Sequence, residues 1–170
     1  YVTLARPPHA TDPEPVNNAR TDAISFPVQP ESCQYSTGIW DGENYGKPTK
    51  SVPEISCGAN CGETWYKFIM PATGFAKIEG NDDLGLLGIN NSEQVIVAYR
   101  GACPELGLIE CGRGGFGEDV DFSISGYDGE VIYLQVFDDE GNAINEDFEI
   151  CVSERCAADD CLDGLNATNI

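Results

Sequence analysis

Apolar side chains recur at every second position along much of this chain, which is the period expected of β-strands with one buried face. The alternation is clear in residues 75–79 (FAKIE) and 120–125 (VDFSIS). Residues 94–100 (QVIVAYR) are apolar and rich in β-branched side chains, which predicts a central strand, and residues 131–137 (VIYLQVF) are a further strongly predicted strand. In chain order, the predicted strands are 24–28, 64–70, 75–79, 94–100, 106–111, 120–125, 131–137 and 147–152.

About eight strands separated by turn residues predict an all-β, jelly-roll-like sandwich of two antiparallel sheets. Pro71 ends the strand 64–70 and a turn follows, so this strand and the strand 75–79 are predicted to form a hairpin. Trp65 and Tyr66 are neighbours on one strand. Because successive side chains of a strand point to opposite faces, we expect one of them in the core and the other at a surface or groove.

The sandwich is predicted to span residues 23–152, between two segments of different composition. Residues 1–22 contain four prolines, which favour an extended arm, with one helical turn expected in residues 17–23. Residues 153–170 are predicted to be an acidic tail that contains cysteine. Inside the sandwich, residues 32–62 are rich in Gly, Ser, Pro and Cys, so we expect a long irregular connection there.

The chain is strongly acidic. It has 29 Asp and Glu against 9 Lys and Arg in 170 residues, and its formal net charge is −20. Scattered cations in such a small number do not form a patch that neutralises phosphates, which argues against nucleic acid as a partner. No apolar run approaches the roughly 20 residues that a membrane helix needs, so membrane insertion is not expected.

Eight cysteines are many for this length, and none of them lies in a CxxC motif. This usage favours disulfides, and therefore a secreted or cell-surface protein. Cys103 and Cys111 bracket a predicted hairpin, which would bring them within bridging distance. The expected pairs are Cys103–Cys111, Cys156–Cys161, and Cys33 with either Cys57 or Cys61, while Cys151 has no assigned partner.

Candidate catalytic residues are few. His9 is the only histidine and lies in the proline-rich arm, so a Ser-His-Asp arrangement is not expected. The 29 acidic residues offer many carboxylate pairs, and this abundance gives no single pair special weight. We therefore predict that the protein is not an enzyme, and a hydrolase built on a carboxylate pair is the alternative.

Four groups of residues follow one another in a distinctive order. They are residues 14–18 (EPVNN); residues 63–68 (ETWYKF) with 71–74 (PATG); residues 95–99 (VIVAY) with 101–103 (GAC) and 108–111 (LIEC); and residues 122–124 (FSI) with 131–136 (VIYLQV) and 147–150 (DFEI). Together they resemble the bacterial pre-peptidase C-terminal domain, which is related to the collagen-binding domains of clostridial collagenases. The resemblance implies a non-catalytic β-sandwich that accompanies secreted enzymes or surface proteins, and some members bind calcium or a polymer.

Calcium is the cofactor that the residues favour. Asp12, Glu14, Asn17, Asn18 and Asp22 lie within eleven residues at the end of the arm. Carboxylate and amide oxygens are ligands that calcium prefers, and the resemblance to calcium-binding members supports the same stretch. We predict a calcium ion held by these five residues, and the alternative is a solvated acidic linker.

Three aromatic residues lie in the irregular connection, namely Tyr35, Trp40 and Tyr45. Their rings are candidate ligand-binding groups that stack on sugar rings or pack against a partner, and the alternative is that they cover the core of their own domain. Asn90 and Asn166 each begin an Asn-x-Ser/Thr pattern, which marks them as glycosylation sites only if the source is a eukaryote.

These features lead to one main prediction and one alternative. The main prediction is a secreted, non-catalytic binding or accessory module for an extracellular polymer, either carbohydrate or protein. The alternative is a structural subunit of an extracellular filament or surface assembly, in which the partners are copies of the same chain.

Overall fold

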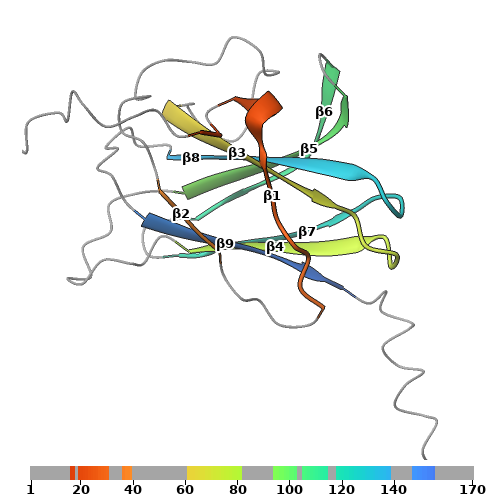
Figure 1. Ribbon diagram of the computed structural model, residues 1–170. Helices are drawn as coiled ribbons and strands as arrows, with labels where there is room; N and C mark the ends of the chain where they lie inside the picture. The colour runs from red at the N-terminus through yellow and green to blue at the C-terminus, as the bar shows by residue number, and fades with distance from the viewer. Residues whose placement is uncertain are drawn as a thin grey trace, which may run out of the picture.

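The computed structural model of the protein describes residues 16–17, 19–30, 36–39, 61–81, 94–102, 105–114, 118–138 and 147–155. These residues form a short 3-10 helix and nine strands (Figure 1). In chain order the elements are η1 (Arg20–Asp22), β1 (Ile24–Ser25), β2 (Ser36–Ile39), β3 (Cys61–Ile69), β4 (Phe75–Asn81), β5 (Gln94–Ala102), β6 (Glu105–Arg113), β7 (Val120–Ser125), β8 (Val131–Asp138) and β9 (Asp147–Glu154).

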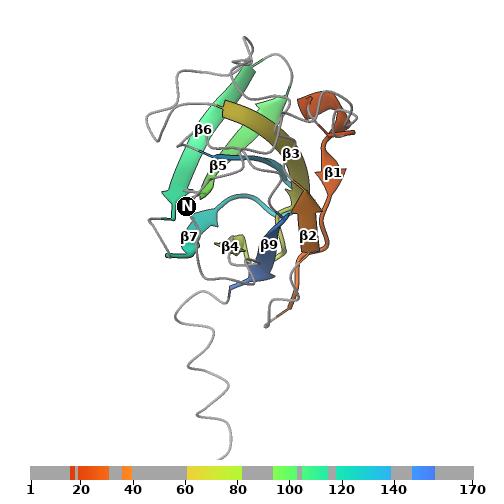
Figure 2. The same cartoon turned by 90° about the vertical axis from the view of Figure 1, so that its left-hand side faces the viewer.

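The strands form two sheets that pack face to face, as Figure 2 shows. The order is β1-β3-β8-β5-β6 in the five-stranded sheet and β2-β9-β4-β7 in the four-stranded sheet. Neighbouring strands run antiparallel, except that β1 is parallel to β3. The predicted all-β sandwich of two sheets is therefore confirmed, and β5 is an interior strand, as its continuous apolar run predicted.

A close approach between the sheets shows which side chains face inward. A Cβ atom added to Gly80 of β4 would collide with the side chain of Ile96 of β5. Ile96 therefore points toward the four-stranded sheet, and its neighbour Val97 points away from it. The register across β8 extends this assignment to β3, where Tyr66 faces inward and Trp65 faces outward.

The outer face of the five-stranded sheet is also buried around Trp65. Trp65 is 1% exposed and Tyr66 is 4% exposed, so the prediction that one of them lies at a surface is wrong, although they do lie on opposite faces. The Trp65 ring centroid lies 5.8 Å from that of Tyr99, and the Tyr99 hydroxyl donates to Gln135 Oε1 over 2.8 Å. Burial of both faces explains why β5 and β8 have so few polar residues.

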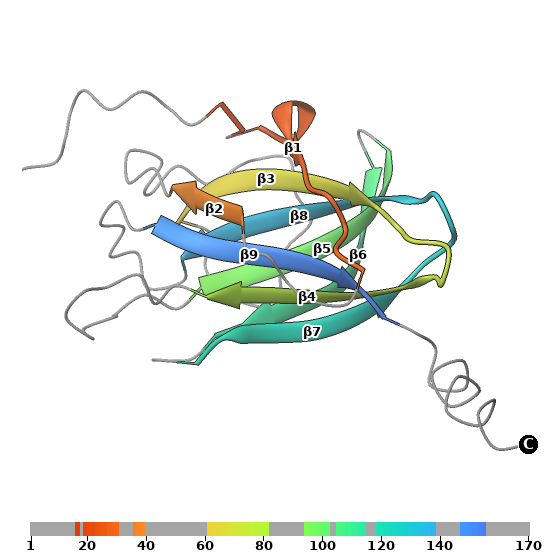
Figure 3. The ribbon, with the colours of Figure 1, turned by 60° about the horizontal axis from the view of Figure 1, so that its bottom comes forward.

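The predicted hairpin of residues 64–70 and 75–79 is wrong, because β3 and β4 belong to different sheets. The turn between them is tight: the Gly74 N–H donates to the Pro71 carbonyl over 2.9 Å. Gly74 has a φ of 70°, a conformation that glycine adopts readily. The chain crosses here from one layer to the other (Figure 3). The same turn residues occur in a hairpin and in a connection between two sheets, so the local sequence pattern does not distinguish these two connections.

Two other boundaries differ from the expectation. Part of the connection predicted for residues 32–62 is regular, because β2 pairs with the beginning of β9 and β3 already starts at Cys61. The strand predicted for residues 24–28 is reduced to the two residues of β1. The sequence of β2 has no apolar alternation, so only its pairing reveals it. The helical turn expected in residues 17–23 is present as η1.

Residues 16–17 and 19–30, which we call the strap, first follow the outer edge of β3. The Trp65 N–H donates to the Asn17 carbonyl over 2.8 Å, and Asn17 Nδ2 donates back to the Trp65 carbonyl over 3.0 Å. Further along, β1 pairs with Tyr66 and Lys67, and the Phe26 N–H donates to the Lys67 carbonyl over 2.8 Å. These bonds satisfy backbone groups that would otherwise face solvent at a sheet edge.

The strap then crosses to the edge of the second sheet. The Gln29 N–H donates to the Val152 carbonyl over 2.9 Å, and the Glu154 N–H donates to the Gln29 carbonyl over 2.7 Å. Between the two edges, the Phe26 ring stacks on the Tyr66 ring with centroids 4.6 Å apart and planes 9° apart. A single segment therefore closes both sheets on one side of the sandwich.

We predict that Asn17→Ala destabilises the protein by about 1–3 kcal/mol, because the carbonyl of the buried residue Trp65 loses a hydrogen bond in a site that water does not easily reach. Urea unfolding measures the change. Thr21→Ala is the matched control, since the Thr21 hydroxyl is exposed and contacts only Asp22, at 3.3 Å, among the hydrogen bonds described. Equal stability of the two variants would show that the strap is not clasped at Asn17.

Candidate binding groove

An open groove of about 400 Å³ lies where the strap leaves the edge of β3. The strap contributes Ser25, Phe26 and Val28 to its lining. The five-stranded sheet contributes Lys67, Phe68 and Ile69 from β3 and Val131 and Tyr133 from β8. The volume and the mostly apolar lining are typical of pockets that bind small ligands or single side chains.

The groove forms where the strap leaves the edge of β3. The strap runs parallel to β3 at Ile24 and Ser25, and its last backbone hydrogen bond to β3 is the one from the Phe26 N–H. Pro27 follows, which has no N–H, and the strap next forms backbone hydrogen bonds at Gln29. The end of β3 is left without the strap beside it, and this opens the groove.

The groove wall is apolar and accessible. Ile69 is 62% exposed and Val131, its register partner on β8, is 40% exposed. Lys67 and Tyr133 are also register partners, so an ammonium group and a phenol flank the apolar wall on the same face. A ligand in the groove would meet an apolar surface with a cation and a hydroxyl beside it.

Tyr66 contacts the strap through its ring, which stacks on Phe26 in the lining of the groove. Burial raises the pKa of the Tyr66 hydroxyl, and hydrogen bonds with the side chains of Asn17 and Thr64 act in the opposite direction. The hydroxyl therefore stays neutral at physiological pH. Its ring holds Phe26 in place by stacking, so the strap side of the groove is fixed before any ligand binds.

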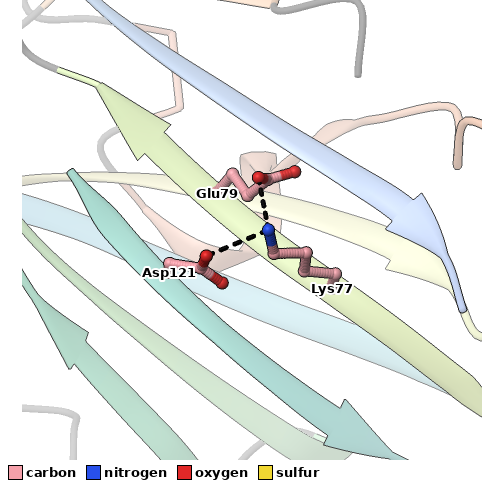
Figure 4. Close-up of polar contacts among 3 residues, drawn as sticks. All are labelled: Lys77, Glu79 and Asp121. Carbon is pink, nitrogen blue, oxygen red and sulfur yellow. Dashed lines mark hydrogen bonds and ion pairs between the residues drawn. The ribbon is translucent and has the colours of Figure 1, made fainter. Parts of the chain in front are cut away.

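A second polar cluster lies on the outer face of the four-stranded sheet (Figure 4). Lys77 Nζ lies 2.6 Å from Glu79 Oε1 and 2.9 Å from Asp121 Oδ2. Glu79 and Asp121 are register partners, so their like charges would repel each other without the lysine. The hydrogen bond to Glu79 raises the pKa of Lys77 most, and the hydrogen bond to Asp121 raises it further. The amine is held protonated, which suits an ion pair and not a nucleophile.

The predicted calcium ligands are only partly described. Asn17 is buried and uses its side-chain nitrogen to clasp β3, while Asp22 is exposed on η1. Asp12, Glu14 and Asn18 lie outside the described residues. Within the part of the chain that is described, no three acidic, histidine or cysteine side chains converge as a metal site. The calcium prediction therefore remains a prediction.

The other predicted site residues lie outside the described residues: Tyr35, Trp40, Tyr45, Asn90, Asn166, Cys33, Cys57, Cys103, Cys156 and Cys161. Of Cys61 only the backbone is described. The groove was missed because it depends on the contact between Phe26 and the strand around Tyr66, which no local pattern reveals. Its one sequence signal is the apolar series Ile24, Phe26 and Val28 ahead of the main strands.

Cys111 and Cys151 are each disulfide-bonded. In the register of β5 and β6, Cys111 lies opposite Val97. Cys103, its partner in the predicted pair, lies outside the described residues, so the pair Cys103–Cys111 remains a prediction.

Among known proteins, no family model and no curated relative matches this chain. The described residues include no helix that is long and apolar enough to span a membrane. The groove and its surroundings are therefore the basis for inferring function.

We predict that stability falls as the pH rises above about 10, the ordinary pKa of tyrosine. Because the pKa of Tyr66 is raised in the folded state, the unfolded chain loses that proton at a lower pH and is favoured as the pH increases. Below the ordinary pKa the stability is fully present. In Tyr66→Phe the decrease between pH 8 and pH 11 should be smaller, as measured by urea unfolding. Tyr127→Phe is the control, since Tyr127 is 79% exposed. An unchanged decrease in Tyr66→Phe would contradict the assignment.

Proposed function

We propose that this protein is a secreted, non-catalytic binding module whose ligand is held in the groove between the strap and the end of β3. The observation that carries the proposal is the accessible apolar wall of Ile69 and Val131 beside Lys67 and Tyr133. Exposed apolar side chains that converge on a groove mark a site of interaction more often than scattered ones do.

The chemistry of the groove favours a protein polymer over a carbohydrate. A sugar ring presents several hydroxyl groups, which need several hydrogen-bonding partners when they are buried. Ser25, Lys67 and Tyr133 are the polar side chains in the described lining, and the remaining lining is apolar. An apolar amino-acid side chain fits such a lining better. The net charge of −20 also favours a basic partner through long-range attraction.

The extracellular location is supported by the cysteines. Eight occur in the chain, and both of those whose side chains are described are disulfide-bonded, which is typical of an oxidising compartment. The resemblance to the pre-peptidase C-terminal domain supports an accessory role beside a secreted or surface-bound protein.

A structural subunit of an extracellular assembly is the second candidate. It is favoured by exposed apolar residues at the end of the sandwich, where Phe75 is 41% and Tyr127 is 79% exposed. The turns that carry them are joined, since the Gly126 N–H donates to the Gly74 carbonyl over 3.0 Å. Light scattering separates the candidates, because a subunit would self-associate at high protein concentration and a monomeric module would not.

The proposal is tested by screening the protein against extracellular matrix proteins and glycans. We expect a protein ligand whose binding is at least tenfold weaker with Ile69→Asp, because a charge placed on the apolar wall must be desolvated. Leu108→Asp on β6 is the matched control, since Leu108 is also exposed, at 44%, lies outside the groove and gives the same charge change. Equal weakening by both variants would contradict the groove.

We also propose that calcium binds Asp12, Glu14, Asn17, Asn18 and Asp22 and fixes the arm to the sandwich. The charges of the three carboxylates repel one another without a cation, and extracellular calcium is near the affinity range of weak modular sites. Melting curves with calcium and with chelator should differ for the wild type. In Glu14→Ala combined with Asp22→Ala the difference should disappear. A calcium effect that is equal in both proteins would place the ion elsewhere.

A further inference from the structure

The edge of β3 beside the groove has backbone groups that no described residue satisfies. Trp65 and Lys67 direct their backbone groups to this edge, where Asn17 and Phe26 bind them. Ile69 is two residues further on, so its N–H and carbonyl point the same way. Among the backbone hydrogen bonds of the described residues that lie outside the strand ladders, none involves either group, and Ile69 is 62% exposed.

The backbone hydrogen bonds of Met70, the residue after Ile69, confirm the direction of the Ile69 N–H and carbonyl. The Met70 N–H donates to the Glu130 carbonyl over 2.8 Å, and the Met70 carbonyl accepts from the Gly129 N–H over 3.1 Å. Met70 therefore turns its backbone groups toward the segment that leads into β8. Since successive residues alternate, Ile69 presents its donor and acceptor on the opposite side, away from the sheet.

We propose that the ligand is an extended polypeptide segment that adds to the edge of β3 at Ile69, in the line that the strap leaves after Phe26. This inference rests on the proposed function and specifies its ligand class. One residue of the segment accepts from the Ile69 N–H and another donates to the Ile69 carbonyl. An apolar side chain of the same segment enters the groove. A peptide backbone supplies a donor and an acceptor at the spacing of a strand, which is the basis of β-strand addition.

Charge restricts the sequence of this segment. The protein carries a net charge of −20, so basic residues in the segment increase its rate of association. Lys67 lines the groove, so the residue above the groove is not itself basic. The segment that fits best has an apolar centre with basic residues on either side. Binding should weaken with added salt, because screening acts on distances beyond about 8 Å at physiological ionic strength.

Strand addition is tested by titrating the synthetic peptide acetyl-Lys-Thr-Val-Ile-Val-Thr-Lys-amide into the full chain and following the NMR spectrum of the protein. The Ile69 amide signal should shift on binding. A second set of peptides carries a single N-methyl group at each central residue in turn, which removes one N–H and keeps every side chain. We expect binding to weaken at least tenfold at the position whose N–H donates to the Ile69 carbonyl, and much less at the adjacent positions, whose N–H groups point away.

The outcomes distinguish the two proposals. If the unmethylated peptide binds and every methylated peptide binds equally well, strand addition is overturned while groove binding stands. If the peptide does not bind but a ligand from the screen still depends on Ile69, strand addition is again overturned and the proposed function stands. If the loss occurs at the one position whose N–H donates to the Ile69 carbonyl, and Ile69→Asp also weakens binding, strand addition is supported. Exchange of both lysines of the peptide for glutamate should weaken binding, and unchanged binding would overturn the charge argument.

Discussion

Backbone hydrogen bonds from one strap to the edges of two sheets are the contacts on which the rest of this structure depends. An open sheet edge exposes unpaired N–H and carbonyl groups and invites pairing with other chains. The strap covers β3 around Trp65 and Lys67 and covers β9 around Ser153. Its Phe26 ring, stacked on Tyr66, fills the gap between the layers, so one segment both closes the edges and shields the core.

At the end of the sandwich the two sheets are joined by side-chain contacts instead of backbone hydrogen bonds. Arg100 of β5 donates from Nη2 to the Ser125 carbonyl of β7 over 2.9 Å. Its Nε lies 3.8 Å from Glu130 Oε1, and the Tyr127 N–H donates to Glu130 Oε2 over 3.2 Å. Glu130 precedes β8, and its carbonyl holds Met70 at the end of β3. The sheet side of the groove is therefore built on strands whose ends are fixed, which is what precise binding requires.

Local patterns predicted the strands well and their connections poorly, for a physical reason. The apolar alternation in β4 and β7 and the continuous apolar runs in β5 and β8 depend on which faces are buried, and each strand carries that information in its own sequence. Pairing depends on residues far apart in the chain, such as Tyr66 opposite Leu134. The turn at Gly74 fits a hairpin and a crossing between sheets equally well. The groove was unpredictable for the same reason, since Ile69 and Val131 meet only after β3 and β8 pair.

The coincidence of three features at one place is the strongest argument for function. Isolated β-proteins blunt their free edges with charges, prolines or bulges and avoid contiguous exposed apolar surface. The end of β3 departs from both rules, because Ile69 is 62% exposed and directs its N–H and carbonyl away from the sheet. The strap bonds to β3 only as far as Phe26 and next bonds to β9 at Gln29. The strap therefore protects the edge of β3 through Lys67 and leaves Ile69 at the position that a partner strand would occupy.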